Sequence, residues 1–177
     1  MKFETLKQES IYRGPAFNVR RDEVRLPNQG ITHLDIIEHV GAVTILPVDD
    51  EGRILFVRQY RHAAGRELLE LPAGTLNTGE PPETCALREI REETGFAAGK
   101  IMKLGEFFLA PGYSTEYMVV YLAAELKHDP LPRDQDEFIS LQPIPIGQAY
   151  RMALSGEVMD GKSLAGLLLA QAYLQKA

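Results

Sequence analysis

The chain has 177 residues, of which 45% are hydrophobic, and a formal net charge of −6 at pH 7, which excludes a largely disordered chain and suits a domain with its own core. The acidic balance disfavours non-specific nucleic-acid binding, because such binding depends on a basic surface that neutralises phosphates. No apolar run reaches the roughly 18 residues of a membrane span, and the first residues lack an apolar signal-peptide core, so we expect a cytoplasmic protein with neither nucleic-acid nor membrane partners.

The N-terminal residues are predicted to form a small antiparallel sheet. Residues 10–26 indicate two short strands, because apolar and charged residues alternate in their second half. The turn sequence PNQG at 27–30 leads into a third strand at 33–40. We therefore divide the chain into an N-terminal strand unit, residues 1–40, and a main domain, residues 41–177.

The main domain opens with two strand patterns joined by the turn sequence DDEG. The nearly continuous apolar run at 42–48 is typical of a strand covered on both faces. With residues 53–60 it is predicted to form a hairpin at the sheet centre. Arg58 and Arg61 lie at the exit of the second strand. Because arginine forks match phosphate oxygens, the pair is either a diphosphate clamp or two solvated edge charges.

A turn-rich loop and a short acidic helix follow, with the sequence GTLNTGEPPETCALREIREETGF. Pro81 suits the first helical position, and Gly95 is placed to end the helix. Glu89, Glu92 and Glu93 fall within an arc of about 100° beside the apolar stripe. Like charges at this spacing repel, so we expect a hard divalent cation, Mg²⁺ first and Mn²⁺ second, among them. The alternative is a solvated helix face with ordinary charge pairs.

Two further residues in this region restrict its chemistry. Glu70 interrupts an apolar run just before the loop. Because an isolated buried carboxylate is costly, we expect Glu70 to face a metal, a substrate or an arginine. Cys85 is the only cysteine, which excludes an intrachain disulfide and a cysteine-based zinc site. We expect an inert, semi-buried thiol there.

The rest of the chain alternates strand and loop patterns and closes with helices. A surface loop rich in Pro and Asp is predicted at 127–136. The predicted strands are 100–109, 117–124 and 137–141, and the predicted helices are 146–155 and 163–175.

The loop and helix together carry the spacing G-x5-E-x7-R-E-apolar-x-E-E-x-G-apolar, which resembles the signature of the Nudix hydrolases at every fixed position. The resemblance implies an α/β (α+β) fold, the Nudix α/β/α sandwich with a mixed central sheet. It also implies divalent-metal-dependent hydrolysis of a nucleoside diphosphate linked to another moiety. By position, Glu89 and Glu93 would be the principal metal ligands. Glu92 would be a further ligand or an orienting catalytic carboxylate, and Arg88 and Glu80 would support the loop and orient the ligands.

Several stretches resemble the branch of the family that acts on ADP-ribose, among them RQYR, LPAG and APGYSTE. In that branch the backbone carbonyl corresponding to Ala73 also binds metal. A carboxylate of the late loop can activate the attacking water, which here indicates Glu137, with Asp134 and Asp136 as alternatives. The expected substrate contacts are Arg58, Arg61, Glu70, Pro111 and Glu116.

These observations predict hydrolysis of ADP-ribose to AMP and ribose 5-phosphate with Mg²⁺ or Mn²⁺. One alternative is a GDP-mannose or other nucleotide-sugar pyrophosphatase, and another is a non-catalytic Nudix module that senses nucleotides. In ADP-ribose-cleaving relatives a comparable N-terminal sheet makes a dimer contact, so residues 1–40 are expected to mediate a homodimer.

Overall fold

The computed structural model describes residues 2–132 and 138–174, and the chain separates into two compact units. The first contains Met1–Gly41 and Phe108–Tyr117, and the second contains Ala42–Phe107 and Met118–Ala177. Phe108–Tyr117 joins the N-terminal unit through backbone hydrogen bonds, for example from the Ile37 N–H to the Tyr113 carbonyl at 2.8 Å. The N-terminal unit therefore includes a segment that is distant in sequence from its strands.

The first unit is an antiparallel sheet with the order β1-β2-β3. Its strands are β1 (Glu4–Arg13), β2 (Asn18–Arg25) and β3 (Ile31–Glu38). β1 begins earlier than the sequence predicted, and its first residue, Glu4, pairs with Arg25 at the end of β2. The early half of β1 is polar and carries no alternating pattern, so pairing with β2, rather than local sequence, makes it a strand.

The second unit contains a mixed sheet and an antiparallel sheet, with the orders β7-β4-β9-β8 and β10-β5-β6. In the mixed sheet β4 runs parallel to β9 and antiparallel to β7. The strands of the mixed sheet are β4 (Ala42–Pro47), β7 (Ala73–Thr75), β8 (Phe96–Phe108) and β9 (Tyr117–His128). The strands of the antiparallel sheet are β5 (Arg53–Arg61), β6 (Arg66–Glu70) and β10 (Ile139–Pro145).

The predicted hairpin of β4 and β5 is wrong, because the two strands belong to different sheets. Within the described residues, a single bridge between Val48 and Ile54 joins the two strand ends. β4 is buried along its whole length, and β5 is buried over residues 54–57. A continuous apolar run indicates that a strand is buried on both faces, but it does not predict which strand pairs with it.

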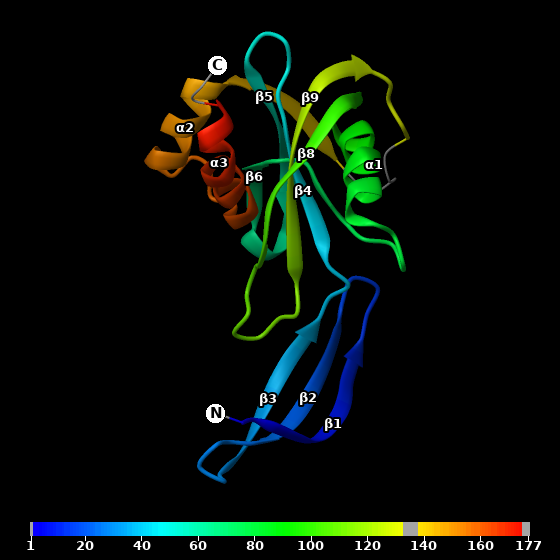
Figure 1. The fold of residues 1–177 in the computed structure, drawn as a ribbon, viewed down its shortest axis with the longest axis vertical. Helices are drawn as coiled ribbons and strands as arrows, with labels where there is room; N and C mark the ends of the chain where they lie inside the picture. The colour runs from blue at the N-terminus through cyan, green and yellow to red at the C-terminus, as the bar shows by residue number, and fades with distance from the viewer. Residues whose placement is uncertain (1, 133–137, 175–177) are drawn as a thin grey trace. The chain divides into compact units, whose positions relative to one another are not determined.

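Helices cover both faces of the strands in the second unit. α1 (Pro82–Thr94) lies on one side, and α2 (Ile146–Ser155) and α3 (Gly161–Leu174) lie on the other (Figure 1). α1 packs against β4 and β7, whereas α2 packs against β5 and β10. The predicted α/β/α sandwich with a mixed sheet is confirmed. Among the described residues, no helix combines the length and apolar character that a membrane span requires.

The core of the second unit anchors the connection that leads into the site. Phe56 of β5 and Leu71, which follows β6, are buried with Leu167 of α3 in one apolar cluster. Burying a leucine side chain contributes about 2 kcal/mol. The Leu71 N–H also donates a hydrogen bond to Ser163 Oγ at 2.7 Å. The start of α3 is thereby fastened to the segment between β6 and β7.

Candidate active site

The ends of α1 follow from local sequence. Pro81 is the N-cap, with φ −63° and ψ 139°, and Pro82 occupies the first helical position, one residue later than predicted. The ring of Pro82 restricts the residue before it to an extended ψ, which keeps Pro81 out of the helix. At the other end Gly95 adopts a left-handed φ of 82° and donates its N–H to the Arg91 carbonyl. This is the geometry that favours glycine after a helix.

The carboxylates of α1 lie at the edge of its buried face. Ala86 and Ile90 are completely buried, while Glu89 and Glu93 retain 7% and 2% exposure. Glu92 is only partly buried. Two nearly buried carboxylates on one helix face are expensive in the absence of compensating charge. This burial argues against the alternative of a purely solvated helix face.

Strand β7 lies directly against these carboxylates. The Ala73 N–H donates to Glu93 Oε2 at 3.1 Å. A Cβ at position 74 would lie 1.8 Å from the Glu89 carboxyl carbon, so any side chain there would displace the Glu89 carboxylate. Gly74 is therefore needed for the close approach of Glu89 to the backbone.

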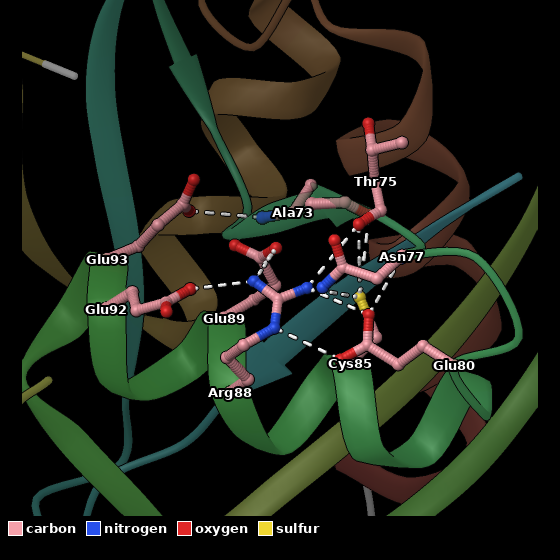
Figure 2. Close-up of polar contacts among 10 residues, drawn as sticks. Ala73, Thr75, Asn77, Glu80, Cys85, Arg88, Glu89, Glu92 and Glu93 are labelled. Atoms are coloured by element: carbon pink, nitrogen blue, oxygen red, sulfur yellow. Dashed lines mark hydrogen bonds and ion pairs between the residues drawn. The ribbon is translucent and has the colours of Figure 1, made fainter. Parts of the chain in front are cut away.

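Arg88 ties the loop to the helix (Figure 2). Its Nη1 donates to Glu89 at 2.6 Å and to Glu92 at 2.8 Å, and its Nε and Nη2 donate to Glu80 at 3.1 and 3.0 Å. The i,i+4 pair of Arg88 with Glu92 is thus one contact of a larger network. The hydrogen bond to Glu80, followed by the charge of Glu89, raises the pKa of Arg88 despite its partial burial.

Arg88 also changes the pKa of Glu80, its partner in the loop. The hydrogen bond from Arg88 lowers the pKa of Glu80 to about 2, and the Asn77 N–H adds to the effect by donating to Glu80.

Burial, followed by the charge of Glu89, raises the pKa of the Cys85 thiol to about 12. Cys85 is completely buried rather than semi-buried as expected, and since the thiolate is the reactive form, its raised pKa is consistent with the expectation of an unreactive thiol.

The donor chemistry of this face suits a hard divalent cation. Glu89 and Glu93 offer carboxylate oxygens, and Gly74 leaves the space that Glu89 occupies. Within residues 2–132 and 138–174, no three His, Cys, Asp or Glu side chains converge closely enough, as they stand, to form a complete ligand set. A full coordination shell at this face would therefore also draw on backbone, substrate or water oxygens.

A second charged cluster lies at the ends of β5 and β6. Glu70 is 1% exposed and accepts two hydrogen bonds from Arg61, at 2.7 and 2.6 Å. It also accepts one from Lys162 of α3, whose Nζ donates to Asp160 at 2.9 Å as well. Burial alone would raise the pKa of Glu70, but the Arg61 hydrogen bonds and the Lys162 charge outweigh it and hold that pKa below its usual value.

Sequence reasoning missed Lys162 as part of this cluster. Asp160 precedes α3 and accepts a hydrogen bond from the Ser163 N–H at 3.0 Å. The one available signal was the run DGKS, in which a lysine sits in the first turn of a helix, where positive charge opposes the helix dipole.

The remaining predicted site residues are spread over different parts of the chain. Arg58 is exposed on β5, and Pro111 lies in an exposed turn of the first unit. Glu116 belongs to the same unit, where its N–H donates to Ser114 Oγ. Glu137, Asp134 and Asp136 lie outside the described residues.

The signature helix sits inside a segment that matches a known family model. The NUDIX domain model matches residues 38–165. The chain belongs to the Nudix family. This Nudix chain is 42% identical over 173 residues to an ADP-ribose pyrophosphatase from Mycobacterium tuberculosis, a match that covers 96% of this chain and 84% of the relative.

Two further comparisons agree with the Nudix assignment. An ADP-ribose pyrophosphatase from Bacillus subtilis is 38% identical over 162 residues, covering 90% of this chain and 88% of the relative. A crystal structure of an ADP compounds hydrolase superposes with a TM-score of 0.89 at 23% identity and covers 99% of this chain and 96% of that one. The structural match shows that the two proteins share the Nudix fold.

Proposed function

We propose that this Nudix enzyme hydrolyses ADP-ribose to AMP and ribose 5-phosphate. The observation that carries the proposal is the intact acidic face of α1, where Glu89 and Glu93 are nearly buried against Gly74 and Ala73. Support for the substrate comes from two relatives named ADP-ribose pyrophosphatase, which match this chain over most of its length.

Glu89, Glu93 and the Ala73 carbonyl would hold Mg²⁺, or Mn²⁺ in its place, with Glu92 as a further ligand. Bound there, the cation would neutralise diphosphate oxygens and lower the pKa of a water molecule. Arg88 would keep Glu89 and Glu92 in place, because its Nη1 donates to both carboxylates.

The substrate is anionic and the chain has a net charge of −6, so local positive charge is needed at the site. Arg61 is held by Glu70 along one edge of its guanidinium, through Nε and Nη2, which leaves Nη1 facing away from that pair. We assign Arg61 and Arg58 to the diphosphate or ribose, and Glu70 to their support. Pro111 and Glu116 are assigned to substrate contacts on sequence resemblance alone.

Glu137 is assigned as the base that accepts the proton of the attacking water, with Asp134 and Asp136 as alternatives. Glu137→Gln should turn over slowly yet bind substrate as the wild type does, because the change removes the base but not the metal ligands. An unaltered rate would move the base to a neighbouring aspartate.

We also propose a cytoplasmic homodimer formed through β1–β3. Support comes from the exposure of this sheet, in which β1 is almost entirely solvent-exposed. Large apolar side chains are among the exposed residues, including Ile11, Tyr12, Ile31 and Leu34, and a surface of this kind favours association. A monomer by light scattering at micromolar concentration would contradict the dimer.

The function is tested with purified protein, Mg²⁺ and a panel of ADP-ribose, GDP-mannose and dinucleoside polyphosphates, with released monophosphate as the readout. We expect ADP-ribose to give the highest kcat/KM, and chelation of the metal to abolish turnover. Preference for GDP-mannose would reassign the substrate. Binding without hydrolysis of any compound would favour a nucleotide-sensing module.

A further inference from the structure

A line of alternating charges connects the start of α3 to the end of β5. Asp160 contacts Lys162, Lys162 contacts Glu70, and Glu70 contacts Arg61 through two hydrogen bonds. Along this line the side chains of Asp160, Lys162, Glu70 and Arg61 are 17%, 9%, 2% and 42% exposed. The inner members are enclosed by protein, and the last member reaches solvent.

This arrangement is poorly explained by stability alone. Taking Lys162 and Glu70 out of water carries a desolvation cost that their attraction offsets only with good geometry, and apolar residues of similar size often do as well. The nearby core already supplies apolar burial through Leu71 and Leu167. What the ion pair adds is a fixed position and orientation for the Glu70 carboxylate.

The orientation of Glu70 determines that of Arg61. Glu70 binds Arg61 in the two-bond, fork-to-carboxylate geometry, which fixes the plane of the guanidinium. Arg61 is close enough to the acidic helix for the charge of Glu93 to be among the causes that raise its pKa. Glu70 lies three residues before Ala73, whose N–H donates to Glu93, so the Arg61–Glu70 pair stands on the segment that leads into the face where the metal and the diphosphate are proposed to bind.

We propose that Lys162, supported by Asp160, is a positioning residue for substrate binding. Lys162 fixes the orientation of the Glu70 carboxylate, and Glu70 in turn orients Arg61 for binding the anionic diphosphate. This inference rests on the proposed function, since it names residues that act on the same site. Lys162 itself touches no substrate, so its loss should weaken substrate binding while leaving the metal-binding face of α1 unchanged.

The test compares Lys162→Met with wild type, and uses Lys103→Met as a matched control. Lys103 lies on β8 with a half-exposed side chain and pairs with Glu106. Calorimetry with the nonhydrolysable α,β-methylene analogue of ADP-ribose gives Kd, Mn²⁺ titration without nucleotide gives metal affinity, and kinetics give KM and kcat. We expect Kd and KM to rise roughly tenfold or more in Lys162→Met, with kcat within about threefold of wild type. Mn²⁺ affinity should be unchanged, and Lys103→Met should match wild type.

Lys162→Met leaves Glu70 with one partner fewer, so it can also destabilise the fold. The double variant Glu70→Gln/Lys162→Met removes both charges together and keeps the buried region neutral. A merely structural role predicts that this variant regains both thermal stability and affinity. Our inference predicts that it regains stability while Kd remains raised, because Arg61 has lost its anchor. Lys162→Arg, which keeps the charge, should restore part of the affinity.

A double-mutant cycle with Arg61→Gln tests whether Lys162 affects substrate binding through Arg61. If Lys162 acts through Arg61, Lys162→Met should not raise Kd further in the Arg61→Gln background. Additive losses, or an unchanged Kd in Lys162→Met, would overturn the inference. A wild type that binds the analogue but does not hydrolyse ADP-ribose would overturn the proposed function, and the Kd ratios would still decide the role of Lys162. A wild type that does not bind the analogue would overturn both.

Discussion

The N-terminal sheet and the region around α1 and β6 are both rich in charge pairs, but the pairs differ in their access to water. In the sheet, Arg21 and Asp35 are direct cross-strand partners at 2.7 Å, with side chains 47% and 58% exposed. In the second region, Glu70 and Lys162 are 2% and 9% exposed. Water can replace either partner of the first pair at little cost, whereas it cannot reach the second.

This contrast teaches that the same residue types serve different purposes. The backbone ladder of β1–β3 sets the register, and its exposed charges add solubility and a weak preference for opposite neighbours. Beside α1, Arg88 is held by three partners at once, Glu80, Glu89 and Glu92. This network fixes the carboxylates that are proposed to bind the metal, so substitutions there should affect activity far more than substitutions in the sheet.

The largest effect is expected from Glu93→Gln. The amide removes a negative charge from the face where we propose that the metal binds, while keeping the shape of the side chain, so turnover with Mg²⁺ should fall about a hundredfold or more with little change in stability. Steady-state kinetics and thermal unfolding measure the two effects. Glu83→Gln, at an exposed position in the first turn of α1, is the control. Near-normal turnover of Glu93→Gln would reject its role as a ligand.

Gly74→Ala should come next, because its added methyl group enters the space of the Glu89 carboxylate, 1.8 Å away. The flexible glutamate can move aside, so stability should change little, but the displaced ligand should lower kcat/KM roughly tenfold to a hundredfold. Gly147→Ala is the matched control, since a Cβ there would meet only Arg151 Nη1 at 3.6 Å. Unchanged activity in Gly74→Ala would show that Glu89 need not lie against β7.

A smaller effect is expected from the pairing of Glu80 with Arg88, and it should depend on pH. The pKa of Glu80 is lowered from 4.5 to about 2 in the folded protein. The pair therefore stabilises the fold above pH 4.5, and this contribution is lost as pH falls towards 2. The unfolding midpoint of Glu80→Gln should lie below that of wild type at neutral pH, and the two should converge near pH 2. A difference that stays constant with pH would assign the effect to packing.

The smallest effect is expected from Arg21→Ala. The Arg21 and Asp35 side chains are 47% and 58% exposed. Their hydrogen bond raises the pKa of Arg21 and lowers that of Asp35, but screening by solvent keeps the pair weak. Thermal unfolding and turnover should both match wild type. A clear loss of stability at dimer-forming concentrations would mean that the pair is buried between two copies, and would remove the contrast drawn above.

The sequence alone determined the signature helix, and the resemblance of its spacing to the Nudix signature implied the class of fold. Pro81, Pro82 and Gly95 mark the ends of α1 through backbone constraints that act within a few residues, and the spacing of Glu89, Glu92 and Glu93 places them on one face of any helix. The family model and the α/β/α layers agree with these predictions. Local rules sufficed because each depends on neighbours in the chain.

Only the tertiary structure decided which strands pair and which charges meet. β4 and β5 separate into two sheets, and the short strands β6 and β7 escape prediction because Glu70 and Pro72 interrupt their apolar pattern. Lys162 reaches Glu70 across 92 positions of sequence. Such contacts form when segments that are distant in sequence pack together and exclude water. The sequence around each of the two residues contains no local pattern that predicts its partner.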